Sequence, residues 1–301
     1  WIYFGHYTGV SRWYPGFMWN ELLGEAGDTY IPQERPWYVA ATSFPRRVVF
    51  PIDKSGSMAD LVDIQGGNGA LPVLTQVNAA VKTVIGTLTE KDSVSVIYFN
   101  ETTSYISSSC SGRPFFYSMS AVNKQRVYSF MDSQTAGGEC NFQAGLDAAL
   151  YMTNDTAAID ENVISWESDC ETIIVMITDG YASMGEKHPD KLAELVTPYT
   201  SGDTVRVMTY GIGKSADGET LERIACAGRG RRVHMEDGDD FSSMLSDYAS
   251  YASSTRMHWQ VTAEQKEQLG AVQFSVPYMD ALGLGMMFTV TKAVVSARED
   301  E

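Results

Sequence analysis

Three oxygen-bearing side chains stand at alternate positions directly after the apolar run 48–52. They are the carboxylate of Asp53 and the hydroxyls of Ser55 and Ser57. A buried strand that delivers these groups to one tight loop presents oxygen ligands to a hard divalent cation. Mg2+ held by one carboxylate and two hydroxyls stays short of a ligand, so a carboxylate of another protein can complete the shell. The alternative is an ordinary turn in which Asp53 caps a helix.

A second apolar run, at 172–178, delivers another acid, Asp179, to a loop. Such continuous apolar runs are typical of parallel strands covered by helices on both faces. Between the two strands, the glycine-rich turn that begins at Gly137 contains Cys140 and leads into a helix-like segment.

These three motifs together resemble a von Willebrand factor A domain with its metal-ion-dependent adhesion site. The resemblance implies that Asp53, Ser55 and Ser57 are first-loop ligands of Mg2+ or Ca2+, and that Asp179 acts directly or through water. Family members usually have Thr where this chain has Cys140, and a thiol is a poor ligand for either cation. Metal binding is the favoured hypothesis, and a vestigial site is the alternative.

The order of the predicted elements indicates an α/β fold with a doubly wound, mostly parallel sheet, as in Rossmann-like domains. Apolar residues recur with a helical period over 72–88. Strands are expected at 93–99, 172–178, 205–213 and 232–235, and helices near 121–131, 142–152, 189–196, 217–226 and 240–251. This domain is predicted to span residues 46–254.

The flanking segments 1–45 and 255–301 are rich in aromatic and turn residues, which is typical of antiparallel sheets and their loops. A strand is expected at 286–291. The flanks resemble the two parts of an antiparallel α+β Cache sensor domain into which the A domain is inserted. The whole arrangement is similar to the extracellular alpha-2-delta subunits of voltage-gated calcium channels and their protist relatives.

The Cache resemblance implies a pocket that clamps a free amino acid. Its residues here would be Tyr30, Arg35, Trp37, Tyr38, Tyr278 and Asp280. Arg suits a carboxylate, and Asp suits an amine. In the alternative, Arg35 and Asp280 pair with each other, and the aromatic residues belong to the core of a structural remnant.

The composition restricts the classes of partner. The chain has 38 acidic and 22 basic side chains and a net charge of −16, which argues against nucleic acid and anionic membranes. No apolar run approaches 18 residues, so membrane attachment would need an anchor outside this chain. Both ends of the chain read as ongoing strands, which suggests an excerpt of a longer protein.

The cysteines and two sequons favour an oxidising compartment, and we expect an extracellular or cell-surface location. Four cysteines allow three full pairings. The alpha-2-delta resemblance implies Cys170 with Cys226, and Cys110 with Cys140. Asn100 and Asn154 begin acceptable glycosylation sequons.

The predicted function is a cation-dependent adhesion or channel-accessory ectodomain. Its metal site would bind an acidic side chain of a channel, adhesion or matrix protein. The alternatives are an amino-acid sensor module and a structural component with a degenerate metal site. An enzyme is not expected, because no acid/base pair, nucleophile system or cofactor loop occurs in the sequence.

Overall fold

The computed structural model describes residues 2–5, 11–14, 46–63, 69–88, 90, 92–106, 114–154, 172–200, 205–236, 272–274, 278–279, 286–287 and 290–292. The chain divides into two compact units. The larger unit is Pro45–Ser242, and the smaller consists of Trp1–Phe44 with Ser243–Glu301. Each unit is described by itself.

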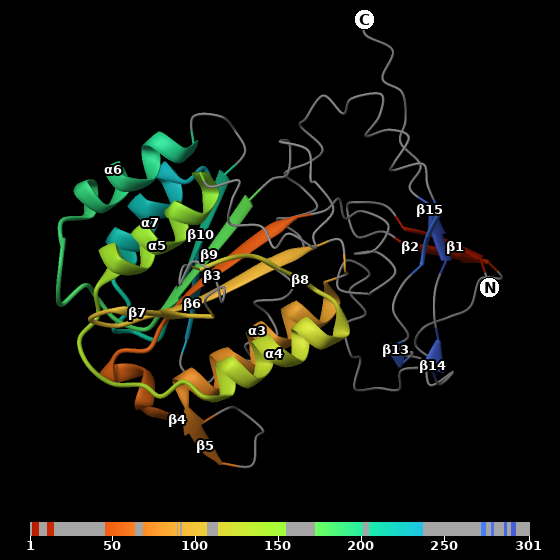
Figure 1. Cartoon of the computed structure of the whole chain (residues 1–301), viewed down its shortest axis with the longest axis horizontal. Helices are drawn as coiled ribbons and strands as arrows, with labels where there is room; N and C mark the ends of the chain where they lie inside the picture. The colour runs from red at the N-terminus through yellow and green to blue at the C-terminus, as the bar shows by residue number, and fades with distance from the viewer. Residues whose placement is uncertain are drawn as a thin grey trace, which may run out of the picture. The chain divides into compact units, whose positions relative to one another are not determined.

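The larger unit is built on a mostly parallel sheet, which confirms the predicted fold class (Figure 1). Its strands follow the order β11-β10-β9-β3-β6-β7, and β8 also pairs with β6. The parallel members are β3 (Arg47–Asp53), β6 (Ser93–Phe99), β9 (Thr172–Thr178), β10 (Val205–Ile212) and β11 (Arg232–Met235). Two short strands run antiparallel to β6, namely β7 (Thr103–Tyr105) and β8 (Tyr117–Ser118).

Strand β3 lies where the winding of the sheet changes direction. The next strand of this sheet along the chain, β6, pairs with one edge of β3, and β9 pairs with the other. Side chains at the carboxyl ends of β3 and β9 therefore meet at a topological switch point, where open α/β sheets bind ligands. Pairing with β9 skips Phe50 and Pro51 between Val49 and Ile52, because a proline has no N–H to donate.

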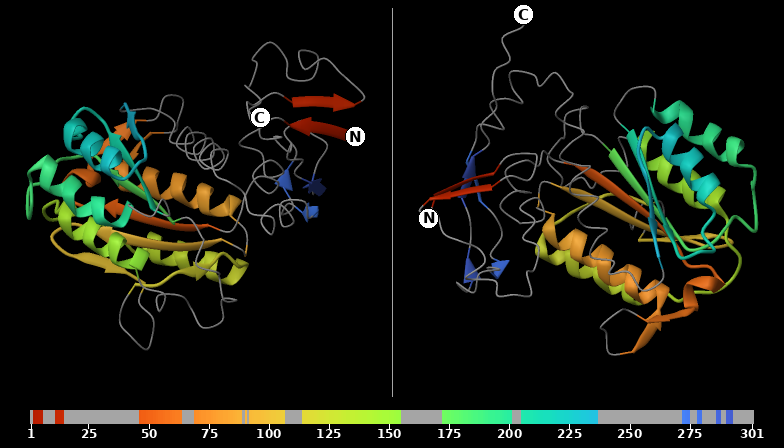
Figure 2. Two further views of the ribbon diagram at one scale, coloured as in Figure 1. Left: turned by 90° about the horizontal axis from the view of Figure 1, so that it is seen from above. Right: turned by 180° about the vertical axis from the view of Figure 1, so that it is seen from behind.

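Five helices of the described residues cover the two faces of this sheet (Figures 1 and 2). One face carries α3 (Val73–Thr87) and α4 (Ala121–Asp132), and the other carries α5 (Phe142–Asn154), α6 (Pro189–Thr200) and α7 (Gly218–Ala227). All five were predicted from the sequence, although α6 continues beyond its predicted end at 196. The helix predicted at 240–251 lies outside the described residues.

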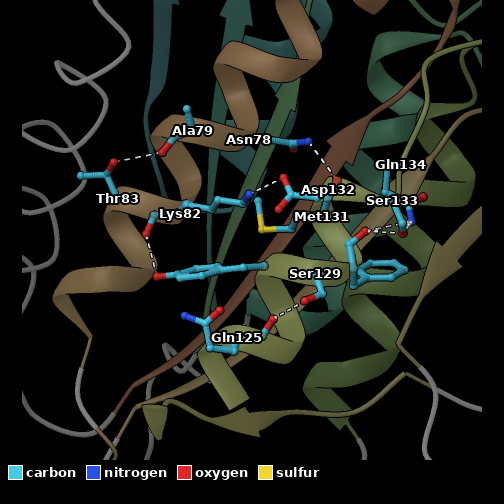
Figure 3. Close-up of polar contacts among 12 residues, drawn as sticks. Asn78, Ala79, Lys82, Thr83, Gln125, Ser129, Met131, Asp132, Ser133 and Gln134 are labelled. Carbon is cyan, nitrogen blue, oxygen red and sulfur yellow. Dashed lines mark hydrogen bonds and ion pairs between the residues drawn. The ribbon is translucent and has the colours of Figure 1, made fainter. Parts of the chain in front are cut away.

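Polar contacts fix α4 against α3 (Figure 3). The buried amide of Asn78 donates to the Met131 carbonyl at 3.1 Å and accepts from the Tyr98 hydroxyl at 2.5 Å. The Lys82 ammonium forms an ion pair with Asp132. Since these contacts hold the last turn of α4, they also fix where the following loop begins, and that loop leads to Cys140.

A short hairpin follows the first predicted metal loop. It begins after the short 3-10 helix η2 (Gly56–Ala59) and pairs β4 (Leu61–Asp63) with β5 (Ala70–Pro72). The hairpin was not predicted from the sequence. In the part of the chain that is described, no helix is long and apolar enough to span a membrane.

The described strands of the smaller unit form three antiparallel pairs. They join β1 (Ile2–Gly5) with β2 (Ser11–Tyr14), β12 (Val272–Phe274) with β15 (Val290–Lys292), and β13 (Tyr278–Met279) with β14 (Met286–Met287). Antiparallel pairing was expected of these flanks, and their assignment to a Cache fold stays a prediction.

Candidate metal centre

Three loops at the carboxyl ends of the central strands bring the predicted metal ligands together. Asp53 ends β3, and Ser55 and Ser57 lie on the turn that enters η2. Asp179 follows β9 directly, and Cys140 lies just before α5. These residues are distant in sequence, and all except the half-buried Ser57 are buried.

The Asp53 carboxylate is fully buried and accepts three hydrogen bonds. Oδ1 accepts from the Ser55 backbone N–H at 2.7 Å. Oδ2 accepts from the Thr178 hydroxyl at 2.5 Å and from the Cys140 thiol at 3.0 Å. Thr178 was not singled out from the sequence, although it is the threonine of the T-D-G motif that marks the third loop.

The Ser57 hydroxyl joins the first loop to the third. It donates to Asp179 Oδ1 at 2.7 Å, and its oxygen lies 3.4 Å from the Ser55 hydroxyl oxygen. Burial raises the pKa of Asp179 from 3.8 to about 6, and the nearby charge of Asp53 acts in the same direction, while the hydrogen bond from Ser57 opposes them. The ionised form of Asp179 is therefore poorly compensated.

Among the described residues, no Lys, Arg or His forms an ion pair with Asp53 or Asp179. Lys54 lies between the ligands in sequence, but its ammonium points elsewhere, to the Ser104 hydroxyl at 2.8 Å and to Gln134 Oε1 at 3.3 Å. The cluster thus holds two buried acidic groups that no basic side chain in the described ranges neutralises.

Backbone hydrogen bonds brace the first loop against the second. The Gly56 N–H donates to the Gly138 carbonyl at 2.9 Å, and the Gly137 N–H donates to the Lys54 carbonyl at 2.8 Å. Gly138 has a φ of 82°, in the left-handed region that favours glycine. The contact of Lys54 with Gln134 adds a side-chain link between the first loop and the segment that follows α4.

The second loop is fixed in the same way to the third. The Cys140 N–H donates to the Ser183 hydroxyl at 3.0 Å, and the Cys140 carbonyl accepts from the N–H groups of Ser183 and Met184 at 2.9 and 3.0 Å. No sequence pattern had pointed to Ser183. The three loops form one hydrogen-bonded frame, so the ligands are positioned before any cation arrives.

The oxygen spacing fits a hard divalent cation. Neighbouring ligand oxygens lie about 3.0 Å apart around octahedral Mg2+ and about 3.4 Å apart at right angles around Ca2+. The Ser55–Ser57 and Ser57–Asp179 oxygen separations of 3.4 and 2.7 Å are close to these values. No three His, Cys, Asp or Glu side chains within the described ranges are grouped to hold a metal ion, so a cation here would depend on the serine hydroxyls.

The Cys140 side chain differs from both of its sequence-based roles. Its thiol is free and buried and donates to Asp53, so the structure does not contain the predicted pairing with Cys110. Burial, together with the charge of Asp53, raises the pKa of this thiol far above its ordinary value. A protonated thiol is a hydrogen-bond donor and not a ligand of Mg2+ or Ca2+.

The remaining predicted positions are the other cysteines and the two glycosylation sites, and of these Asn100 belongs to the hydrogen-bonded loops of the cluster. Cys226 is also a free thiol, exposed on α7, so its predicted pairing with Cys170 is likewise not formed. Cys110 and Cys170 themselves lie outside the described residues. Asn154 is the last residue of α5. The Asn100 amide nitrogen, to which a glycan would be attached, donates to the Gly137 carbonyl at 2.8 Å within the loop frame.

The predicted amino-acid pocket falls almost wholly outside the described residues. This holds for Tyr30, Arg35, Trp37, Tyr38 and Asp280. Tyr278 is placed in β13, where its backbone pairs with Met287. The pocket therefore stays a prediction.

Comparison with known proteins gives a family match over most of the larger unit. The model of the von Willebrand factor type A domain family matches residues 48–247. The whole chain is similar to human voltage-dependent calcium channel subunit alpha-2/delta-2, at 28% identity over 304 residues, and to rat subunit alpha-2/delta-3, at 26% identity over 310 residues. The chain spans only 23% and 25% of the length of these two relatives.

Solved structures agree on the fold. A von Willebrand factor type A protein from Catenulispora acidiphila superposes with a TM-score of 0.54 at 18% identity, covering 70% of this chain and 43% of that one. The D319A mutant of the PilB minor pilin from Streptococcus sanguinis gives a TM-score of 0.51 at 15% identity, covering 71% of this chain and 62% of that one.

Proposed function

Because this chain belongs to the von Willebrand factor type A domain family, we propose that its loop cluster is a cation-dependent adhesion site. Asp53, Ser55, Ser57 and Asp179 would hold Mg2+ or Ca2+. When bound, the cation would supply an open coordination position for a carboxylate of a protein partner. The backbone frame of the three loops orients the hydroxyls, and Thr178 fixes the Asp53 carboxylate.

The observation that carries this proposal is the meeting of two buried carboxylates that have no basic partner in the described part of the chain. Removing an ionised carboxylate from water is costly unless opposite charge compensates it. Asp53 is fully buried and accepts from the backbone N–H of Ser55, while Asp179 is 7% exposed and accepts from the Ser57 hydroxyl. The hydroxyl oxygens of these two serines lie 3.4 Å apart. A divalent cation beside those hydroxyls would offset the cost for both carboxylates.

Exposed apolar side chains near the cluster support a protein as the partner. Six large apolar side chains are exposed in the described part of the chain, and four of them are Leu61, Leu71, Tyr181 and Met184. Leu61 and Leu71 lie on the hairpin that follows the Ser57 loop, and Tyr181 and Met184 lie on the Asp179 loop. Aromatic and apolar residues are typical of the cores of protein interfaces. We infer that the partner's carboxylate is flanked by apolar side chains.

The proposed setting is an extracellular adhesion or channel-accessory protein. The similarity to calcium channel subunits covers about a quarter of their length, so a channel partner is part of the proposal. The net charge of −16 opposes the approach of another acidic protein. A cation at the loop cluster would make that approach favourable at one place on the surface.

Calorimetric titration of the full chain with Mg2+ and with Ca2+ tests the site. Asp53→Asn removes the buried charge with little change of shape, and we expect it to weaken cation binding at least about tenfold. Glu194→Gln on α6 is the matched control, because it makes the same charge change at an exposed position. Equal affinity in wild type and Asp53→Asn would refute the site.

The partner chemistry needs a separate measurement. The probe is a panel of short peptides with a single Asp between Leu and Phe, compared with peptides that carry Asn, or serine flanks, at those positions. Binding in the presence of Mg2+ or Ca2+ should require both the Asp and the apolar flanks, and it should weaken in Tyr181→Ser. Binding that ignores the Asp would contradict a cation-mediated contact.

A further inference from the structure

Asn100 directly follows β6 and uses both polar atoms of its side-chain amide in hydrogen bonds. Nδ2 donates to the Gly137 carbonyl at 2.8 Å, and Oδ1 accepts from the Thr102 backbone N–H at 3.2 Å. The Asn100 carbonyl accepts from the Asn141 N–H at 3.1 Å. Asn100 therefore holds the second loop at both ends, at Gly137 through its side chain and at Asn141 through its backbone.

The Gly137 end of the second loop supports the loop that carries the first cation ligands. The Gly137 N–H donates to the Lys54 carbonyl at 2.8 Å. The next carbonyl, of Gly138, accepts from the Gly56 N–H at 2.9 Å. These two bonds fix the backbone on either side of Ser55, one of the proposed cation ligands. Because the N–H and the carbonyl of Gly137 are both bonded, loss of the side-chain contact at its carbonyl also weakens the support of the first loop.

The same amide nitrogen is the acceptor atom of the glycosylation sequon 100–102. N-glycosylation forms a bond between Nδ2 and the anomeric carbon of a lipid-linked oligosaccharide. The bond from that carbon to the lipid pyrophosphate breaks, the pyrophosphate leaves with the electron pair, and Nδ2 loses one proton. The nitrogen that holds the second loop would then carry a sugar ring.

The folded loop leaves little room for a sugar on the side of Nδ2 that faces Gly138. A Cβ built on Gly138 would lie 3.1 Å from Nδ2 and 3.2 Å from Glu101 Oε1. The backbone approaches the amide this closely because Gly138 has no side chain and has a φ of 82°. The bond from the Thr102 N–H to Oδ1 opposes rotation of the amide away from the loop. A sugar ring on Nδ2 therefore competes with the second loop for the same space.

We propose that Asn100 positions the second loop for cation binding, and that N-glycosylation of its sequon prevents this. Because the amide is engaged in the folded loop, the sugar has to be added before the loop closes. A chain that carries this glycan then folds without the contact between Asn100 and Gly137. The inference rests on the proposed function, because the loop that it controls supports the cation ligands.

The two sequons of the chain provide matched forms for the test, all produced as the full chain in a glycosylating secretory host. In Asn154→Gln only Asn100 can be glycosylated, and lectin chromatography separates the occupied from the unoccupied molecules. Thr102→Val removes the first sequon at an exposed position and keeps the Asn100 amide and the backbone of residue 102. This variant can carry a glycan only at Asn154, the last residue of α5. Asn100→Ala removes the sequon and the amide together.

Calorimetric titration with Ca2+ and hydrogen exchange of the segment 134–141 are measured on each form. Asn154→Gln molecules with the Asn100 glycan should bind Ca2+ about tenfold more weakly than molecules without it. Their exchange in 134–141 should be about fivefold faster, the factor expected for one lost hydrogen bond. Asn100→Ala should show both changes, and Thr102→Val should show neither. Exchange in β9 should be equal in all forms, whereas a general loss of stability would raise it as well.

The opposite results would overturn each part of this inference separately. Equal Ca2+ affinity and exchange in occupied and unoccupied molecules would overturn the effect of the glycan, and so would the absence of any glycan at Asn100. An Asn100→Ala variant that matches Thr102→Val would overturn the positioning role. Failure of the proposed function is distinguishable, because it appears as absent Ca2+ binding in every form or as equal affinity in Asp53→Asn. Exchange in 134–141 still decides in that case whether Asn100 holds the loop.

Discussion

The buried carboxyl group of Asp179 makes the stability of the larger unit depend on pH when no cation is present. Its pKa is raised from 3.8 to about 6 by burial first and by the charge of Asp53 second. An acid whose pKa is higher in the folded than in the unfolded chain favours folding only while it is protonated. The free energy of unfolding therefore falls as pH rises from 3.8 to about 6.

The size of the effect follows from the shift. Two pKa units correspond to about 3 kcal/mol when the group is fully ionised, of which about 2 kcal/mol is lost between pH 4.5 and 7.5. Asp179→Asn removes this dependence and keeps an oxygen that can accept from Ser57. Across that pH range, wild type should thus lose about 2 kcal/mol more stability than the variant.

Hydrogen exchange of peptides that cover β3 and β9 measures this quantity locally, after correction for the intrinsic exchange rate. The measurement is made with EDTA, and Glu194→Gln is the control for a simple change of net charge. Parallel pH profiles for wild type and Asp179→Asn would refute the reasoning, because they would mean that the buried carboxylate is compensated. Saturation with Ca2+ should suppress the difference, since a bound cation stabilises the ionised carboxylate.

Three further predictions concern the frame around the site. Gly145→Ala should destabilise the larger unit by about 1–3 kcal/mol, because its Cβ would lie 2.7 Å from a phenylalanine ring of β6. Gly137→Ala is the control in the same exchange measurement and should have little effect, because a Cβ there would have no atom within 4 Å. Tyr98→Phe should cost about 1–3 kcal/mol in denaturant unfolding, because it leaves the amide oxygen of the α3 asparagine in Figure 3 unpaired. Iodoacetamide followed by peptide mapping should label the exposed Cys226 in the native protein and Cys140 only after unfolding; native labelling of Cys140 would contradict its burial.

The fold could be predicted largely from the sequence, because buried parallel strands are continuous apolar runs and the covering helices have a clear period. The hairpin of β4 and β5 gave no such signal. Its strands have three residues each, and its large side chains at Leu61 and Leu71 are exposed, so no alternation against a core marks them.

The residues of the site likewise include some that could be predicted from the sequence and others that could not. Asp53, Ser55 and Ser57 could be predicted because their spacing within one loop fixes their relation. Thr178 and Cys140 contact Asp53 across 125 and 87 residues, and the direction of their side chains depends on how the sheet and loops pack. Spacing alone identifies the loop on which a cysteine lies, but it does not show whether the sulfur is a ligand, half of a disulfide or a hydrogen-bond donor.

The two carboxylates of the cluster depend on a cation to different degrees. Asp53 accepts from a backbone N–H, a hydroxyl and a thiol, so the protein itself solvates much of its charge. Asp179 accepts from the Ser57 side chain, and its pKa is raised, which means that its charge is the less well supported of the two. A bound cation would therefore stabilise the fold mainly through Asp179. The thiol of Cys140 acts on the other carboxylate, where it supports the charge without a cation and takes the place of an oxygen ligand. Cation binding is therefore expected to stabilise the larger unit more through the loop that carries Asp179 than through the loop that carries Asp53.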